Sequence, residues 1–403
     1  AIQSGGADDM LLVPVSTTYD QMHEVGVMAA EEAGAPKAQE NLLWLAGYAR
    51  TQQRRIGKAY VRFGEPLSLR EALERADHEG GGKWTVAKIA FEVFQRINEC
   101  TPVTAPALVT FALLGVHERA LTLSEVHDQV QPLLDYAQAR QLPGCGLETL
   151  REPEGVEDIL HALVRAGVVS GHEGGTATVY KIEHGQHSVA AFYRNSAIHW
   201  FVNRAILELA LLDDTHDDLA GPLERAWAAA FALRDLLKFE FFFSDKATFR
   251  EEQKAESRII DPKFRQRAAT AKDRREILLK LPVLIAHRVL APFIEAYFIV
   301  ADRLAAQPVD AKIDKKALTE ECLRVGRQYV LQQRLGNPEC VSREVFGNAL
   351  SLAANRDLLT PGAPDLAQRR QAFADELAAA VQGVADIEEL DRMRRSAKAK
   401  AAR

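Results

Sequence analysis

The feature that most constrains this fold is the helical spacing of its apolar residues, which continues almost without interruption from His187 to about Leu390. Apolar residues that recur every three or four positions form a stripe on one side of a helix, and such stripes must pack together. The pattern therefore predicts a large helical domain over residues 187–390. Its candidate helices span residues 196–212, 223–242, 278–306, 318–335, 343–354 and 366–381.

Residues 1–70 show a different pattern. Short apolar runs at 11–17 and 59–63 end in turn residues, which predicts two strands, and residues 38–48 between them have helical spacing. We expect the two strands to pair in one sheet with Pro14 near a strand end, because proline cannot donate to a strand ladder. The region is typical of the last part of an α/β layer. Strands separated from their neighbours would leave an edge exposed.

Residues 71–186 are expected to form a helical linker followed by a small winged-helix-like segment. Helical spacing at 123–140 and 156–166 precedes two strand-like runs at 168–170 and 176–182. Two helices followed by a hairpin are typical of winged-helix domains, so nucleic-acid binding is one alternative function. The presumed wing at 171–175 contains no Lys or Arg, which argues against that alternative.

Overall charge also argues against nucleic acid as a partner. The 403 residues include 50 basic and 56 acidic side chains, giving a formal net charge of -6. Phosphate backbones require a positive surface. The C-terminal segment 391–403 is an exception because it is strongly basic and low in complexity. Such a segment is usually a solvated tail, and attraction to anionic lipid is the more specific hypothesis.

Cysteine usage and hydropathy exclude two further classes. Cys100, Cys145, Cys322 and Cys340 lie far apart without a C-x-x-C pair, which fits a reducing compartment and gives no metal signature. The longest charge-free apolar stretch, residues 100–116, contains two prolines. It is shorter than the roughly 20 residues that a spanning helix needs. No transmembrane segment is predicted.

Two N-terminal segments resemble a known family. Residues 11–20 read Leu-Leu-Val-Pro-Val-Ser-Thr-Thr-Tyr-Asp, and residues 60–69 read Tyr-Val-Arg-Phe-Gly-Glu-Pro-Leu-Ser-Leu. The pair resembles the block that closes the catalytic domain of glycerol-3-phosphate acyltransferases. Residues 193–202, 233–243, 293–297 and 344–350 are similar to further blocks of the large bacterial and mitochondrial branch of this family. The resemblance thus extends from residue 11 almost to the C-terminus.

The resemblance implies acyl transfer from acyl-CoA or an acyl carrier protein to the sn-1 hydroxyl of glycerol 3-phosphate, the first step of phospholipid synthesis, with no cofactor. The family's catalytic motif is His-x-x-x-x-Asp, in which the histidine accepts the hydroxyl proton. None of the eleven histidines is followed by Asp five positions later. The chain also begins at Ala1, without Met. We therefore expect it to be the C-terminal part of a longer enzyme and inactive alone.

The resemblance also implies site residues in the closing block. Val13, Pro14 and Tyr19 match it by position, and Asp20 and Glu24 match it less directly. In the family this block is associated with binding the acyl donor and shaping the site. Proline fits such a position because it fixes φ and removes a ladder donor where a strand leaves its sheet.

Other residues that could carry chemistry have simpler interpretations. The acidic run at 213–218 lacks fixed ligand spacing and is interpreted as a solvated loop rather than a metal site. Cys145 lies between glycines and has no identifiable histidine partner, so it is interpreted as a turn residue. His199 is expected to be a packed core histidine, and the aromatic run 239–243 to lie in the core. The apolar residues 281–300 could form an interfacial face.

The sequence therefore predicts an α+β fold that is mostly α. Residues 1–70 are the end of an acyltransferase α/β layer, 71–186 the linker and winged-helix-like segment, 187–390 the helical domain and 391–403 the basic tail. The expected partners are the acyl donor, glycerol 3-phosphate and an anionic membrane surface. The expected location is peripheral, at the cytoplasmic face of the cell membrane. Besides the nucleic-acid binder, the alternative is a regulatory helical module that docks to lipid or to a protein.

Overall fold

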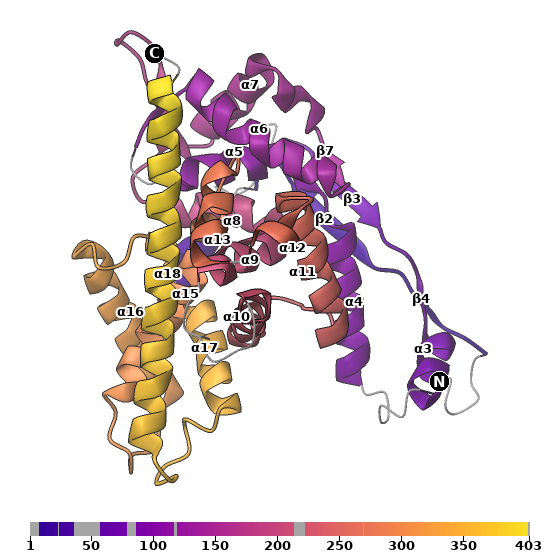
Figure 1. Ribbon diagram of the computed structural model, residues 1–403, viewed down its shortest axis with the longest axis vertical. Coiled ribbons are helices and arrows are strands. Elements are labelled where there is room, and N and C mark those ends of the chain that lie inside the picture. Colours follow the sequence, from indigo (N-terminus) through magenta and orange to yellow (C-terminus); the bar gives the residue numbers. More distant parts are fainter. Residues whose placement is uncertain are drawn as a thin grey trace, which may run out of the picture.

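The computed structural model describes residues 8–22, 24–35, 57–78, 86–116, 119–212, 222–268 and 270–401. Within these ranges the chain is mostly helical with four small sheets, which confirms the predicted fold class. Figure 1 shows helix α18 along one side of the molecule and the antiparallel pair of strands β2 and β3 on the other. This pair is named the hairpin, although α1 lies between its two strands in the sequence. The helix predicted over residues 38–48 lies outside the described residues.

The N-terminal strands pair as the sequence predicted. Strand β2 (Val15–Tyr19) pairs antiparallel with β3 (Ala59–Phe63), and β1 (Leu11–Leu12) pairs with β4 (Leu67–Ser68). The single strand predicted over 11–17 is divided in two, because Pro14 interrupts it. The prediction that Pro14 lies at a strand end is confirmed. Helices α1 (Val25–Glu32), α3 (Leu69–His78) and α4 (Val86–Cys100) follow these strands, and α4 lies against β2.

The middle of the chain has winged-helix topology. After β5 (Val103–Thr104) and α5 (Ala105–Leu114) come β6 (Leu121–Thr122), α6 (Leu123–Ala139), β7 (Gly144–Cys145), a 3-10 turn at Glu148–Arg151, α7 (Pro153–Arg165), β8 (Val169–His172) and β9 (Val179–Ile182). The last two strands form the predicted hairpin, and β6 adds a third strand in the order β6-β9-β8. The two residues of β6 were too few to give a strand pattern. All ten residues of α5 are buried.

The C-terminal half is helical, as predicted, but several predicted helices are shorter or divided. The helices are α8 (His187–Ile198), α9 (Val202–Leu212), α10 (Pro222–Leu236), α11 (Lys246–Ile260), α12 (Phe264–Arg267), α13 (Ala271–Lys280), α14 (Ala286–Val289), α15 (Ala291–Ala305), α16 (Lys315–Leu331), α17 (Arg343–Asn355) and α18 (Leu366–Ala401), with a 3-10 turn at Pro338–Cys340. Helix α15 packs against α16, α17 and α18.

Each break has a local cause. The helix predicted over 278–306 is wrong because Leu281 precedes a proline and takes an extended conformation, which ends α13. Pro292 then lies in the first turn of α15, where proline is tolerated. The helix predicted over 196–212 is also divided. At the break, the Nε1 of Trp200 donates to the carbonyl of Thr101 over 2.9 Å.

The prediction that residues 281–300 could face a membrane is wrong, and the C-terminal segment differs from a solvated tail at its start. Residues 281–300 do not form an interfacial face, because nearly all of them are buried in the core. The segment from residue 391 does not begin as a solvated tail, because α18 continues to Ala401 and buries Leu390 and Asp391. Its Ala, Lys and Arg residues favour helix, and this buried face holds the helix to the core. No helix in the described ranges is long and apolar enough to span a membrane.

Candidate functional site

The residues of the closing block lie on the hairpin and at the start of α1. Burial alternates along β2: Ser16 and Thr18 are buried, whereas Val15 and Tyr19 are about 40% exposed. Val61 and Phe63 on β3 are 52% and 72% exposed. Because Val15 is opposite Phe63, and Tyr19 is opposite Ala59, these side chains share one face of the hairpin. The hairpin thus turns an apolar face to solvent and a hydroxyl-bearing face to the helices.

The inner face of the hairpin is held by polar contacts and close packing. The hydroxyls of Ser16 and Thr101 are 2.8 Å apart. Pro14 is buried, and its carbonyl accepts from the amide of Gly64 over 2.8 Å. A Cβ at Gly64 would lie 3.3 Å from that of Cys100, so this glycine allows a close approach between the strand and α4. Pro14 therefore has a packing role, and Val13 faces solvent with 48% exposure.

Asp20 and Glu24 connect the hairpin to α1. A carboxylate oxygen of Asp20 accepts from the amide of Lys58 and the hydroxyl of Tyr60, both over 3.3 Å. Burial raises the pKa of Asp20, against the lowering effect of these donors. Glu24 occupies the N-cap position of α1 without a side-chain cap bond. The structure brings Asp20 together with Tyr60 but places these block residues outside the cavity that α1 helps to form.

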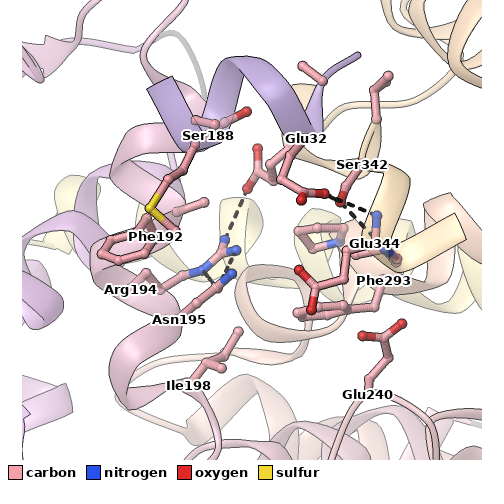
Figure 2. Close-up of a pocket in the computed structure, with 18 of the residues that line it drawn as sticks. Glu32, Ser188, Phe192, Arg194, Asn195, Ile198, Glu240, Phe293, Ser342 and Glu344 are labelled. Carbon is pink, nitrogen blue, oxygen red and sulfur yellow. Dashed lines mark hydrogen bonds and ion pairs between the residues drawn. The ribbon is translucent and has the colours of Figure 1, made fainter. Parts of the chain in front are cut away.

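That cavity is the candidate site. Its volume is about 580 Å³, and Figure 2 shows side chains from α1, α8 and the start of α17 pointing into it. The remaining walls come from Asn98 on α4, from residues 240–242 after α10, from the start of α15 and from Glu339 and Val341 before α17. Four segments quoted above for their family resemblance converge on it. They contribute Arg194, Asn195, Ile198, His199, Glu240, Phe241, Phe242, Phe293, Glu344 and Val345.

Arg194 is the single arginine in the described wall of the cavity, and its guanidinium is already engaged. The side chain is 2% exposed and pairs with Glu339 over 3.0 Å. It also donates to the carbonyl of Arg288 and to the side chain of Asn195. A buried arginine with partners on all three of its nitrogens fixes helix α8 in place. It is not free to hold an incoming phosphate.

A second polar contact joins the N-terminal block to the far end of the chain. One carboxylate oxygen of Glu32 accepts from the hydroxyl of Ser342 over 3.1 Å and from the amide of Glu344 over 3.0 Å. Both donors are at the N-terminus of α17, where a negative charge is stabilised by the helix dipole. Figure 2 shows the side chain of Glu32 directed toward Ser342. The contact holds α1 against α17.

The pKa values of His199 and Glu240 are shifted from their ordinary values. Burial lowers the pKa of His199 to about 4, so the ring is neutral at pH 7, and its Nε2 lies 3.0 Å from the carbonyl of Asn98. His199 is half-buried in the wall of the cavity, so the interpretation as a packed core histidine is wrong in placing it in the core. Burial raises the pKa of Glu240 to about 7, although Asn348 donates to its carboxylate over 3.2 Å. The hydroxyl of Tyr297 beside Glu240 also lowers the pKa of that carboxyl.

We expect Glu240→Gln to remove a pH dependence of stability. Because the folded-state pKa of Glu240 is raised from its ordinary 4.5 to about 7, the folded protein binds more protons than the unfolded chain between these pH values. Stability should therefore fall as pH rises from about 4.5 to 7, by on the order of 1–3 kcal/mol. Urea unfolding at several pH values would measure this. The unfolding free energy of Glu240→Gln should change less with pH than that of the wild type. The control Glu154→Gln, at an exposed position, should keep the wild-type pH dependence. The same pH dependence in Glu240→Gln and the wild type would contradict the raised pKa of Glu240.

The charge of the cavity limits its ligands. Five glutamates line it: Glu31, Glu32, Glu240, Glu339 and Glu344. The single arginine in its described wall, Arg194, is already paired. An anionic ligand such as a sugar or polyol phosphate would meet like charges there. Within the described part of the chain, no group of His, Cys, Asp and Glu could hold a metal ion. The acidic run at 213–218, interpreted above as a loop, lies outside the described residues.

Comparison with known proteins identifies the family. Residues 28–362 match the family model described as the glycerol-3-phosphate acyltransferase C-terminal region. The chain belongs to this family. The first relatives are an acyltransferase named plsB1 from Mycobacterium tuberculosis and its counterpart from Mycobacterium bovis, each 44% identical over 398 residues. A protein named glycerol-3-phosphate acyltransferase from Aeromonas hydrophila is 25% identical over 396 residues.

The relatives are longer than this chain. The match covers 97% of this chain but 64% of each plsB1 protein, and 94% of this chain but 47% of the Aeromonas protein. The chain thus spans about two thirds or less of the length of the curated relatives it matches. The family resemblance inferred from the sequence blocks is confirmed. The assignment of Val13, Pro14, Tyr19, Asp20 and Glu24 to acyl-donor binding stays a prediction.

The sequence blocks that resemble the acyltransferase family contained some residues of the cavity but did not reveal the partners of those residues. Arg194 lay inside a quoted block, although nothing in the sequence identified its partner Glu339. Glu32 gave no signal, because its two donors lie more than 300 residues further along the chain. A contact of this kind becomes visible only in the folded structure.

Proposed function

We propose that this chain is the C-terminal part of an enzyme that transfers an acyl group from acyl-CoA or acyl carrier protein to the sn-1 hydroxyl of glycerol 3-phosphate. The observation that carries the proposal is the hairpin, whose exposed face bears Val15, Tyr19, Val61 and Phe63. A two-stranded sheet is at most marginally stable alone and normally buries its apolar face. A further layer packed on that face would complete an α/β catalytic domain.

The chemistry requires a base that this chain lacks. Acyl transfer needs a group to accept the proton of the attacking hydroxyl and donors to stabilise the oxyanion that forms on the thioester carbonyl. By family resemblance the base is a histidine in a His-x-x-x-x-Asp motif, which does not occur in the 403 residues. The acidic cavity is also unsuited to glycerol 3-phosphate. The reacting groups would therefore be supplied by the remaining part of the longer protein.

An activity assay tests this division of roles. With glycerol 3-phosphate and a long-chain acyl-CoA, the isolated chain should show no turnover above a heat-treated control. The longer protein that includes the His-x-x-x-x-Asp motif should be active. Turnover by the isolated chain would overturn the proposal. Donor KM measurements on Pro14→Ala in the longer protein test whether the closing block binds the acyl donor.

We also propose that the enzyme works at the cytoplasmic face of the cell membrane as a peripheral protein, within phospholipid synthesis. The product of the reaction is an amphiphile, which must be delivered to a bilayer. Arg392 and Met393 on α18 are exposed, and basic residues continue to the C-terminus. Each cation near an anionic surface contributes about 1 kcal/mol. Salt-sensitive co-sedimentation with anionic vesicles would support this location. Binding that is absent or independent of salt would contradict it.

The alternative of a nucleic-acid-binding winged helix finds no support. Helix α7 is the second helix of the winged-helix segment, and its exposed positions include Glu154 and Asp158. A groove-binding helix needs basic or neutral side chains at such positions. The winged-helix topology is therefore interpreted as an architectural unit of the helical domain.

A further inference from the structure

A basic groove lies between helices α10 and α11, away from the acidic cavity. It has a volume of about 710 Å³ and is open to solvent (Figure 1 shows the two helices in the lower centre). Its cationic lining residues are Arg234, Lys246, Arg250 and Lys254. None of these four residues contributes to the cavity of Figure 2. The groove is thus a separate feature of the surface.

The two arginines are held in place by aromatic rings. The guanidinium carbon of Arg234 lies 5.7 Å from the centre of the Phe243 ring and 5.5 Å from that of Phe249. The guanidinium carbon of Arg250 lies 5.4 Å from the Phe231 ring centre. Stacking on aromatic faces orders guanidinium groups without using their hydrogen-bond donors. One Nη of Arg234 also donates to the carbonyl of Ser244 over 2.6 Å. The buried Nε of Arg234 has no hydrogen-bond partner among the described residues.

Both acidic residues of the groove have cationic partners, Asp235 outside the lining and Glu251 within it. Asp235 pairs with Lys238 over 2.9 Å and with Arg356 over 3.4 Å, and both of these cations lie outside the groove lining. Glu251 pairs with Lys254 over 2.7 Å. Arg234, Lys246 and Arg250 have no ion pair with an acidic side chain in the part of the chain that the structure describes. The groove therefore has a net positive charge.

The backbone at the start of α11 does not supply the anion site. Asp245 accepts from the amides of Ala247 and Thr248 over 2.8 and 3.1 Å, so these helix N-terminal donors are occupied. An anion in the groove would be bound by side chains. Arginine forks match the geometry of phosphate oxygens, and lysine adds charge.

We propose that the groove between α10 and α11 binds a phosphate group, on a molecule large enough to use the open volume beside it. The phosphate can belong to a free metabolite or to a lipid headgroup, because both present the same doubly or singly charged oxygens. This site does not depend on the acyl-transfer proposal. Evidence against one of these two proposals would not contradict the other.

The test uses the full 403-residue chain and two probes. Calorimetric titration with inorganic phosphate, against chloride at matched ionic strength, measures binding of a free phosphate. Co-sedimentation with phosphatidylglycerol vesicles, against phosphatidylcholine vesicles, measures binding of a lipid headgroup. The variant Lys246→Gln/Arg250→Gln removes two exposed cations of the groove. Arg275→Gln/Lys280→Gln removes two exposed cations from α13 and is the matched control.

We expect binding in at least one arm, weakened about tenfold or more by the groove variant and less than twofold by the control. The arm that binds identifies the source of the phosphate. Because the substituted side chains are exposed, both variants should unfold at the wild-type temperature. Absence of binding in both arms, or equal weakening by the groove and control variants, would overturn the proposal.

Discussion

We expect Asp391→Ala to lower the free energy of unfolding by about 3–5 kcal/mol, because it leaves a fully buried arginine without its counter-ion. The Nη2 of Arg288 lies 3.0 Å from the carboxylate of Asp391, and neither side chain is exposed. Arg394 and Arg395 approach the same carboxylate to 2.7 and 3.2 Å. Urea unfolding would measure the loss.

The surroundings of Asp391 explain why the effect should be large. Burial alone would raise the pKa of Asp391, but the charges of Arg288 and its neighbours hold it well below the ordinary value. The carboxylate is thus ionised at every pH above strong acid, and its stabilising contribution should be lost only when pH falls into that range. Arg288 also fits closely against Gly115, where a Cβ would overlap the guanidinium.

A control on the same helix separates this effect from helix propensity. Asp386 is exposed and accepts one bond from Gln382 over 2.9 Å, so Asp386→Ala should cost less than about 1 kcal/mol. The paired variant Arg288→Met/Asp391→Leu should recover most of the stability, because an apolar pair needs no counter-ion. A loss below 1 kcal/mol for Asp391→Ala would show that the ion pair does not anchor α18.

The second large effect concerns the hairpin in the longer enzyme. We expect Phe63→Asp to reduce acyltransferase activity there at least tenfold, because a carboxylate would be buried between the hairpin and the layer packed on it. In the isolated 403-residue chain the same change should alter stability by less than about 0.5 kcal/mol, since Phe63 is 72% exposed. Activity and unfolding measured on both proteins would test the difference.

Leu331 provides a matched control for this experiment. It is 84% exposed at the end of α16, on no strand, and Leu331→Asp should change neither activity nor stability. Full activity of the Phe63→Asp enzyme would remove the hairpin face from the catalytic layer. The proposed packing of a catalytic layer on this face would then be contradicted.

Apolar spacing predicted the helical domain well but not its internal breaks or its polar members. Helix α17 was predicted within one residue at its C-terminal end. Helix α11 was missed because its sequence is mostly polar and charged, although Asp245 gives it an N-cap that could have been recognised. Helix α18 was predicted too short, because its apolar residues become sparse after residue 381 while Ile387 and Leu390 remain buried.

The candidate site was predictable in its parts but not as a whole. Blocks that gave the family resemblance line one cavity, yet no periodicity could show that residues 194, 240, 293 and 344 would meet. The pairs Arg194–Glu339 and Glu32–Ser342 depend on how distant helices pack. Side-chain identity along one sequence does not contain that information. The acidity of the cavity was also unforeseen, because its five glutamates come from separate parts of the chain, with only Glu31 and Glu32 adjacent.

The short connection between β2 and α1 has a consequence for how two parts of such an enzyme would associate. Gln21 donates to the carbonyl of Ala162 over 2.9 Å, and the hydroxyl of Tyr193 accepts from the amide of Met22 over 3.3 Å. With Glu32 bonded to the start of α17, the segment is attached to the helical body at both ends. A sheet layer that docked on the hairpin would therefore find its partner strands already ordered. Little conformational entropy would be lost on association, so even a modest apolar contact could hold the two parts together.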